Sequence, residues 1–413
     1  MLERNGISAI QETLRKDYEN NEFIRLMRKI VRENREENEL YDEICESADF
    51  DVDDVNSIQD LELIPVIPTT YYKESNNKFK KLLKIPESKL EHWNVSSATQ
   101  GDPSIVGVDK NDMNFLFEMA RKCYLDFLPR DWERASVYCF SPSAKFLDRI
   151  SLRYTKIRPI RAYSGNYYRV SEEMVKHMEY LFGFSILRAI KAIITSLSIK
   201  GGFKIKRSEF IKIINENLEK PEEEQDYIAI GGSNHLINQF MQYMRENDLQ
   251  YNLGEDFDVV VGGGGWDGIK GQLKYEPIDK SKFVSDVAEL FGTKRKRVID
   301  VYGFTECPIV FGSHWSEKHQ DFIFHTPPYA RIIVRDVDTT EPLREEGSRG
   351  FLEVLTPFGS NASIKHAIGV DDHVELISKH RCPECGYEGD TFRILGRLEQ
   401  REGMGCSSII SWV

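Results

Sequence analysis

Four apolar segments that each end in a turn of small residues constrain the fold of this chain most strongly. They are 135–143 (ASVYCFSPS), 226–234 (DYIAIGGSN), 255–268 (EDFDVVVGGGGWDG) and 296–306 (KRVIDVYGFTE). Helical patterns separate them, such as HLINQFMQYMREN after the second segment. A repeated strand, tight turn and helix predict an α/β fold with a mostly parallel sheet. Ligands of such sheets bind outside the carboxyl ends of the strands, where these turns fall.

The pattern of apolar and polar residues differs on each side of this α/β region. Residues 1–60 carry apolar side chains at helical spacing and are predicted to form an N-terminal helical segment. Pro65 and Pro68 interrupt that pattern and begin an α/β core that we assign to 61–320. Residues 321–413 alternate strand-like runs with polar turns, which predicts a small β-rich subdomain followed by a C-terminal tail.

Charge and cysteine content limit the partners and the compartment. The net charge of -12 argues against binding to nucleic acid, since phosphate contacts need clustered Lys and Arg. The N-terminus is charged and helical in pattern, unlike a secretory signal, and no apolar run is long enough to span a bilayer. The chain has 7 cysteines without disulfide-framework spacing. A cytoplasmic protein with free thiols is therefore expected.

The segment from Ser96 to Ser104 (SSATQGDPS) is rich in hydroxyl groups and contains one glycine. Ser96, Ser97, Thr99 and the backbone near Gly101 offer O–H and N–H donors that could surround a phosphate. Most loops of this composition are only turns, so both readings stay open.

The segment Tyr302-Gly303-Phe304-Thr305-Glu306 directly follows an apolar strand. The ring of Tyr302 could stack on a nucleobase, Gly303 would let the backbone approach a ligand, and Glu306 could hold Mg²⁺ against phosphate oxygens. The alternative is a turn whose tyrosine is buried in the core and whose glutamate faces water.

Two further turns could contribute to the same site. The four glycines 262–265, including Gly264 and Gly265, are costly to order, which indicates close approach of a ligand or a flexible loop tip. Near the end of the chain, Asp372 follows a glycine and could accept both hydroxyls of a ribose. Arg397, after another glycine, could contact a phosphate.

The order and spacing of these motifs resemble the adenylate-forming superfamily, in particular its phenylacetate–CoA ligase branch and, within it, the acyl-protein synthetases of bacterial luminescence (LuxE type). The resemblance covers roughly residues 60–410, and YGFTE is its most specific element. The runs IPVIPTTYYK, GGGGW and GRLEQREGMGC support it. The implied fold is a large adenylation body without the mobile C-terminal domain of other ligases.

The resemblance also implies roles for individual residues. Those expected around ATP lie in the turns already described: Ser96, Ser97, Thr99, Gly101, Gly264, Gly265, Tyr302, Gly303 and Asp372. Tyr302 would pack on adenine and Asp372 would hold the ribose. Thr305 would contact the adenylate phosphate, Glu306 would bind Mg²⁺, and Arg397 would lie at a hinge near the phosphate.

Two positions depart from the family pattern. Ala98 stands where the family's phosphate loop has glycine, and Asp371 competes with Asp372 for the ribose. The chain stops seven residues after Cys406, which lies between Gly405 and Ser407. Cys406 approximately matches the acyl-accepting cysteine of the luminescence synthetases, although an incidental cysteine in the tail is the alternative.

Cys382 and Cys385 form a Cys-x-x-Cys followed by glycine, which is half of a tetrahedral Zn²⁺ site. Cys307 and His314 are the further ligands that we assign, with His319 and His325 as other candidates. Some relatives of the phenylacetate–CoA ligase branch have a structural Zn²⁺ in this region. A redox pair is the alternative, but the strand-to-helix context of a thioredoxin motif is missing.

The expected function is therefore ATP- and Mg²⁺-dependent activation of a carboxylic acid, with a fatty acid as the favoured class. The acyl group would pass to a thiol, Cys406, and onward to a partner such as an acyl reductase or an acyl carrier. Two alternatives remain: a ligase that transfers to coenzyme A or to a carrier protein, and a non-catalytic, zinc-stabilised nucleotide-binding protein.

Overall fold

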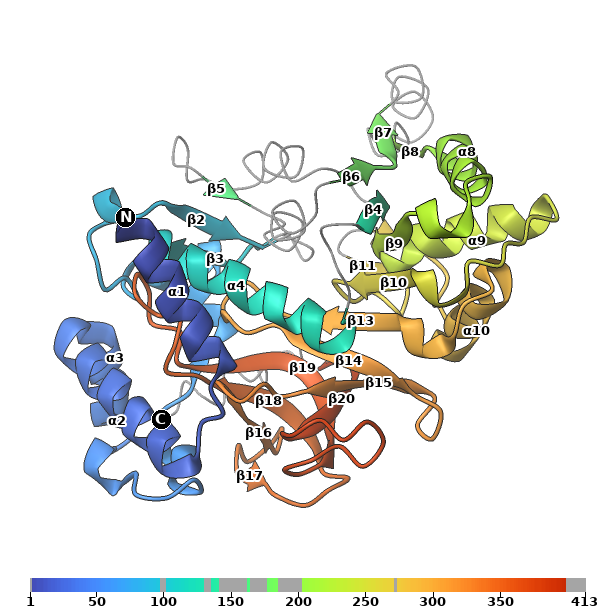
Figure 1. The fold of residues 1–413 in the computed structure, drawn as a ribbon. Coiled ribbons are helices and arrows are strands. Elements are labelled where there is room, and N and C mark those ends of the chain that lie inside the picture. The colour runs from blue at the N-terminus through green and yellow to red at the C-terminus, as the bar shows by residue number, and fades with distance from the viewer. Residues whose placement is uncertain are drawn as a thin grey trace.

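The computed structural model describes most of the chain (Figure 1): residues 2–96, 102–129, 135–140, 162–163, 177–184, 203–270 and 273–398. Its described strands form one 13-stranded sheet and three small sheets.

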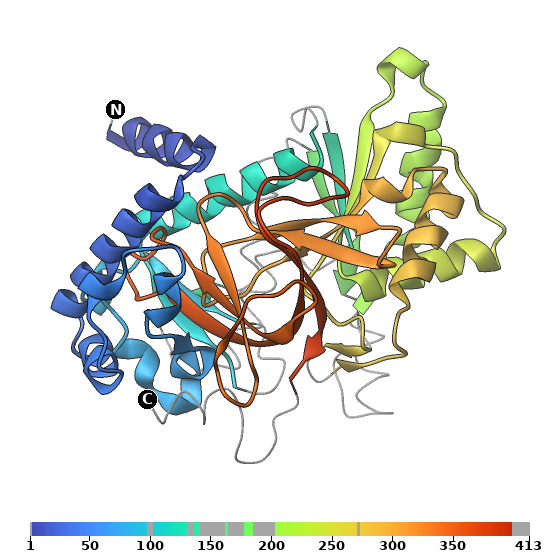
Figure 2. The ribbon, with the colours of Figure 1, turned by 90° about the horizontal axis from the view of Figure 1, so that it is seen from below.

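Helices form the N-terminal segment, as predicted: α1 (Leu2–Arg15), α2 (Asn20–Glu37) and α3 (Glu39–Ser47). Phe23, Met27 and Val31 make the apolar stripe of α2 and are fully buried. Asn38 begins α3 because its side chain accepts the backbone N–H of Tyr41, which satisfies one free donor of the first turn. These helices lie on the opposite side of the molecule from the helices of the parallel sheet (Figure 2).

The parallel part of the large sheet contains the four predicted strands and one more. They run in the order β6 (His177–Tyr180), β4 (Ala135–Phe140), β9 (Tyr227–Gly232), β10 (Phe257–Gly262) and β13 (Val298–Tyr302). The accompanying helices are α8 (Arg207–Leu218), α9 (Asn234–Glu246) and α10 (Lys280–Phe291). Every residue of β4 is buried, as expected for a strand covered on both faces. The predicted α/β fold is thus confirmed.

Antiparallel strands follow, with the order β14, β15, β20, β19, β18, β16 and β17 away from β13. Their bounds are β14 (Phe311–Ser316), β15 (Asp321–His325), β16 (Arg331–Arg335), β17 (Pro342–Leu343), β18 (Arg349–Leu355), β19 (Ala367–Ser378) and β20 (Thr391–Arg397), and β1 (Ile67–Pro68) pairs with β19. The sequence predicted a small β-rich subdomain here, appended to the α/β body. Its strands continue the parallel sheet, because β14 pairs with β13 through Val301–Gly312 and Tyr302–Phe311.

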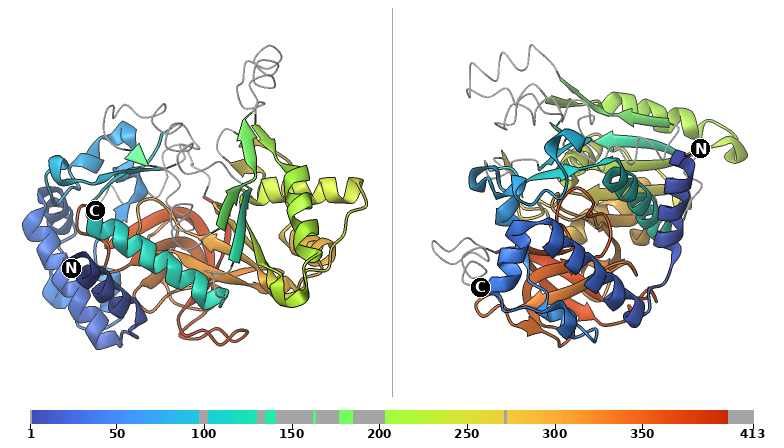
Figure 3. Two further views of the ribbon diagram at one scale, coloured as in Figure 1. Left: turned by 45° about the horizontal axis from the view of Figure 1, so that its top comes forward. Right: turned by 90° about the vertical axis from the view of Figure 1, so that its left-hand side faces the viewer.

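Smaller elements surround the large sheet (Figure 3). They are β2 (His92–Val95), β3 (Ile105–Val108), β5 (Ala162–Tyr163), β7 (Phe182–Phe184), β8 (Phe203–Ile205), β11 (Ile269–Lys270), β12 (Leu273–Lys274) and the helix α4 (Lys110–Phe127). Short 3-10 turns occupy Val52–Asp54, Asp60–Leu63, Thr69–Tyr72, Glu74–Asn76, Lys78–Lys80, Glu87–Lys89, Glu222–Glu224, Gly254–Asp256 and Arg295–Arg297. None of the helices in the described ranges combines the length and the apolar character that a bilayer crossing requires.

Candidate active site

The glycine turn and the Tyr302–Glu306 segment lie side by side at the carboxyl ends of two paired parallel strands. Gly262, the last residue of β10, pairs with Val301 of β13, so the chain leaves both strands at the same edge of the sheet. Gly263, Gly264 and Gly265 then adopt φ values of 81°, 64° and 86°. Side chains rarely tolerate this left-handed region, which explains the run of glycines.

Two hydrogen bonds anchor the glycine turn. Trp266 Nε1 donates to Asp300 Oδ2 over 2.9 Å, and the Tyr275 hydroxyl donates to the carbonyl oxygen of Gly265 over 2.8 Å. Asp300 is buried in β13, and this burial raises its pKa to about 6. Asp300 was not predicted from the sequence, because its partner Trp266 follows a different strand.

Tyr302 and Asp372 are joined by a hydrogen bond of 2.7 Å from the tyrosine hydroxyl to Oδ2 of the carboxylate. Asp372 lies on β19 and pairs across the strands with Arg397 of β20, whose Nε is 3.6 Å from the other carboxylate oxygen. Burial raises the pKa of Asp372, and Arg397 opposes that shift. The structure therefore brings together three residues that the sequence predicted for one nucleotide site.

Asp371 and Asp372 face different partners, as neighbours on a strand should. Asp371 accepts a hydrogen bond of 3.4 Å from the hydroxyl of Thr69, while Asp372 lies against Tyr302. Asp372, and not Asp371, therefore lies in the group with Tyr302 and Arg397.

Glu306 is almost completely buried, with 4% of its surface exposed, although it belongs to a turn. Burial raises the pKa of its carboxyl group, and the positive charge of Lys73 lowers it in part. Lys73 reaches this region because its segment forms an antiparallel bridge with Ser104. Sequence reasoning did not select Lys73. The only signal was its place at the end of the IPVIPTTYYK run.

Ser96 closes the neck of the hydroxyl-rich loop. Its side-chain oxygen accepts the backbone N–H of Ser104 over 2.8 Å, and its own N–H donates to the carbonyl of Ser104 over 2.9 Å. Thr305 is partly buried beside Glu306. The remaining residues predicted for the phosphate loop and for acyl transfer lie outside the described part of the chain: Ser97, Thr99, Gly101 and Cys406.

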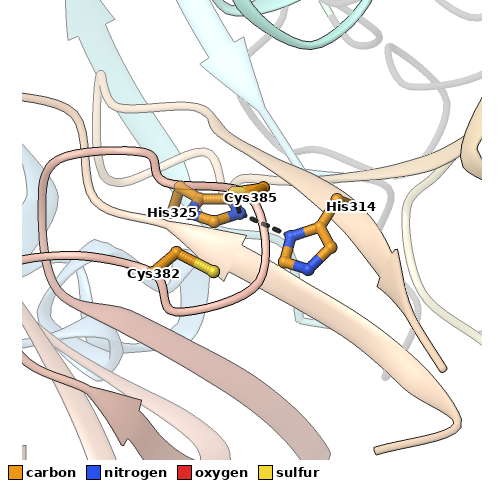
Figure 4. Close-up of side chains that lie close together, drawn as sticks. All are labelled: His314, His325, Cys382 and Cys385. Carbon is orange, nitrogen blue, oxygen red and sulfur yellow. Dashed lines mark hydrogen bonds between the residues drawn. The ribbon is translucent and has the colours of Figure 1, made fainter. Parts of the chain in front are cut away.

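A second constellation lies apart from these turns and contains His314, His325, Cys382 and Cys385 (Figure 4). One potential ligand atom of each lies within 4.8 Å of all the others. Cys307, which the sequence analysis assigned to this group, is not part of it. Its buried thiol follows Glu306, and burial raises its pKa to about 12. His325 takes the place that was assigned to Cys307.

The fold is similar to that of a ligase whose structure was solved with an acyl-adenylate of its own substrate, 2-HIB-AMP. The open conformation of 2-hydroxyisobutyryl-CoA ligase with 2-HIB-AMP and CoA aligns with a TM-score of 0.57 and 13% sequence identity, covering 92% of this chain and 75% of that one. The same ligase in its thioesterification state aligns with a TM-score of 0.57 and 14% identity, covering 92% and 68%.

Comparisons of the sequence then identify the family. The family described as acyl-protein synthetase, LuxE, matches residues 192–412, more than half of the chain. The chain therefore belongs to the LuxE family of acyl-protein synthetases, and it is an AMP-forming ligase. The long-chain-fatty-acid–luciferin-component ligase of Aliivibrio fischeri is 22% identical over 356 residues, covering 85% of this chain and 79% of that relative. The predicted resemblance is thus confirmed.

Proposed function

We propose that this chain uses Mg²⁺ and ATP to activate a fatty acid as an acyl-adenylate and then transfers the acyl group to a thiol. The observation that carries the proposal is the hydrogen-bonded pair Tyr302–Asp372 close to the buried Glu306, at the carboxyl ends of parallel strands. Groups suited to a ribose and to a metal-bound phosphate thus lie on strands of one sheet or directly after them. The chain also belongs to a family of AMP-forming ligases.

On the nucleoside side, the Asp372 carboxylate would accept the ribose hydroxyls, since an ionised carboxylate offers several acceptor positions. The ring of Tyr302 would pack beside adenine, together with the backbone of Gly303. Gly264 supports this placement, because a side-chain carbon built there meets no atom within 4 Å. The turn at Gly264 thus leaves room for a base to approach the backbone closely.

On the phosphate side, Glu306 fits a magnesium site because it supplies a buried carboxylate oxygen, the ligand type that Mg²⁺ prefers. When bound, the ion would neutralise charge on the phosphates. Thr305 would contact the phosphate that stays with the adenylate, and Arg397 would lie close to it. The hydroxyl loop with Ser96 at its neck would enclose the phosphates that leave, with Lys73 as an additional cation.

The proposed reaction has two steps. An oxygen of the substrate carboxylate attacks the α-phosphorus, the bond to the bridging oxygen breaks, and pyrophosphate leaves. The thiolate of Cys406 then attacks the acyl carbon, and AMP leaves with the electron pair of the broken C–O bond. The thiol gives up its proton before this attack, since only the thiolate is a strong nucleophile. The site contributes mainly by orienting the reactants and by excluding water from the mixed anhydride.

The name of the Aliivibrio fischeri relative supports a long-chain fatty acid as the substrate class. An acyl reductase or an acyl carrier that accepts the acyl group from Cys406 is the expected partner. Coenzyme A as the acceptor is the competing outcome.

Labelling of the protein tests the transfer step. Wild-type protein incubated with Mg²⁺, ATP and a radiolabelled long-chain fatty acid is expected to gain label that hydroxylamine removes, as for a thioester. Cys406→Ser should lose the label, whereas Ser407→Ala, its neighbour, should keep it. Equal labelling of Cys406→Ser would contradict the role of Cys406. Unlabelled wild-type protein that forms soluble acyl-CoA would identify coenzyme A as the acceptor instead.

A further inference from the structure

The cluster of His314, His325, Cys382 and Cys385 draws its members from two regions of the antiparallel sheet. His314 lies on β14 and is paired with Ile323 of β15, so His325, two residues further along β15, projects from the same face. The two cysteines lie in the connection between β19 and β20. Cys385 and His325 are 60 positions apart in the sequence, and their side chains lie next to each other in the fold.

The potential ligand atoms lie as near to one another as the ligands of one metal ion would, and the two imidazole nitrogens lie closer than in an occupied site because they share a hydrogen bond. Nδ1 of His314 is 2.8 Å from Nε2 of His325, and Sγ of Cys385 is 3.6 Å from the same Nε2. In a tetrahedral zinc site with Zn–N and Zn–S bonds of about 2.0 to 2.3 Å, neighbouring ligand atoms lie about 3.3 to 3.8 Å apart. Figure 4 shows both imidazoles and both cysteines around the same small volume.

The Cys-x-x-Cys loop is already folded into a tight turn that presents both sulfur atoms. The backbone N–H of Gly386 donates to the carbonyl of Cys382 over 3.0 Å, and the N–H of Cys382 donates to the carbonyl of Tyr387 over 2.9 Å. Gly386 has a φ of 78°, which permits this reversal. The turn leads into strand β20 and not into a helix, unlike the dithiol motif of thioredoxin-like proteins.

The second nitrogen of each histidine lacks a hydrogen-bond partner, although both atoms are buried: His314 Nε2 and His325 Nδ1. Metal-binding histidines commonly direct that nitrogen towards a carboxylate. Glu384 is placed for this role, since one of its oxygens lies 3.9 Å from His314 Nε2 and the other accepts a 2.7 Å hydrogen bond from Ser316. A small adjustment or a bridging water would complete the contact.

Aromatic rings close the other side of the cluster. Phe127, the last residue of α4, stacks on His325 with ring centroids 5.1 Å apart and on Tyr387 with centroids 5.4 Å apart. Cys382 and His325 are buried, with 2% and 1% of their surfaces exposed. Cys385 is exposed and His314 is half-buried, so the cluster reaches the surface on their side. Four protein ligands nevertheless leave no open position for a substrate, which is typical of a structural metal and not of a catalytic one.

We propose that His314, His325, Cys382 and Cys385 together bind one structural Zn²⁺, with Glu384 orienting His314. Two thiolates and two neutral imidazoles balance the charge of the ion, and binding releases the two thiol protons. This mixed sulfur and nitrogen set suits Zn²⁺ and not Mg²⁺ or Ca²⁺, which prefer oxygen.

The ion ties the β19–β20 connection to the β14–β15 hairpin. Asp372 and Arg397 lie on β19 and β20, so the metal holds in place the hairpin that carries the proposed ribose site. This consequence rests on the proposed function, whereas binding of the ion does not.

Metal analysis of the full chain tests the proposal. Protein prepared with reductant and dialysed against metal-free buffer is expected to retain one zinc ion per chain by plasma mass spectrometry. Replacement with Co²⁺ should give the visible bands of tetrahedral cobalt and a thiolate charge-transfer band. Both Cys385→Ser and His325→Asn should lose zinc. The intensity of the charge-transfer band should fall in Cys385→Ser, because this variant lacks one thiolate. His380→Asn is the matched control, because this exposed histidine of the same loop has a φ of 66° that asparagine tolerates.

Glu384→Gln keeps the proposal testable if the ligand variants fail to fold. This variant retains all four ligands, and its Kd for zinc, measured by competition with a chelator, is expected to rise about 10- to 100-fold. Folded wild-type protein without zinc, or with Cys382 and Cys385 joined in a disulfide, would overturn the proposal. An unchanged zinc Kd in Glu384→Gln would overturn the orienting role of Glu384.

Discussion

The hydroxyl of Tyr302 donates a 2.7 Å hydrogen bond to Asp372, although 70 positions separate the two residues. Tyr302 ends the last parallel strand, and Asp372 lies within the antiparallel strands that continue the same sheet. Burial and the neighbouring carboxylate raise the pKa of Tyr302, so its hydroxyl stays protonated and remains a donor. The two ends of the proposed adenosine site are thereby fixed relative to each other.

Asp372→Asn tests the proposed ribose contact. The amide oxygen can still accept the Tyr302 hydroxyl, but the negative charge is lost. Hydrogen bonds to charged groups contribute about 1.5–3 kcal/mol, so the KM for ATP is expected to rise about 10- to 100-fold. Asp371→Asn is the matched comparison and should have a much smaller effect, because Asp371 faces Thr69. A larger increase of the KM for ATP in Asp371→Asn than in Asp372→Asn would assign the ribose contact to Asp371 instead.

Gly264→Ala tests the close approach of a base to the glycine turn. Gly254 provides an unusually close control, because φ is 64° at Gly264 and 62° at Gly254 and neither has an atom within 4 Å of an added Cβ. Both alanine variants should lose about 1–2 kcal/mol of stability through backbone strain. Only Gly264→Ala should also raise the KM for ATP, by about tenfold, if its methyl group meets the base. An equal KM for ATP in the two variants would show that the glycine turn does not contact the base.

Lys73→Gln tests the electrostatic link between Lys73 and Glu306. Lys73 lowers the pKa of Glu306 against the effect of burial, so its removal should raise that pKa further. In the proposed function, Glu306 binds Mg²⁺ as the ionised carboxylate. The acidic limb of the pH–rate profile should therefore move to higher pH, with Lys89→Gln, at an exposed position, as the control. A limb that stays in place, or moves to lower pH, would contradict the link.

Asp300→Asn tests the cost of ionising a buried carboxyl group. The pKa of Asp300 is about 6 in the folded chain, compared with about 3.9 for an unfolded aspartate. The folded state thus binds more protons between these pH values, and its stability falls as the pH rises from about 4 to 6, by about 3 kcal/mol.

The asparagine variant lacks this loss and can still accept the Trp266 N–H. Urea unfolding is expected to show that Asp300→Asn gains stability relative to wild type as the pH rises from 4 to 7. A difference that is independent of pH would show that Asp300 does not ionise in this range.

The local pattern was sufficient to predict the α/β fold and four of the five strands in the parallel part of the large sheet. Segments such as 255–268 and 296–306 carry their own information, because apolar strands end there in glycine-rich turns. The continuity of the sheet was not predictable in the same way. It depends on the pairing of β13 with β14, and strand pairing is set by tertiary packing that no single segment encodes.

The same distinction applies to the sites. Tyr302, Glu306 and Asp372 stand in turns whose chemistry and order in the sequence are informative. Lys73, Asp300 and His325 were missed or left as one option among several. Their roles come from contacts with Glu306, Trp266 and the Cys-x-x-Cys loop, which lie far away in the sequence.

Exchange of labelled pyrophosphate into ATP is the most direct test of the central claim that this chain adenylates a carboxylic acid. The assay should be run with Mg²⁺ over fatty, aromatic and short-chain acids, in wild type and in Glu306→Gln. We expect exchange that depends on a long-chain fatty acid and that Glu306→Gln abolishes. Wild-type protein that binds ATP but exchanges pyrophosphate with none of these acids would contradict the claim.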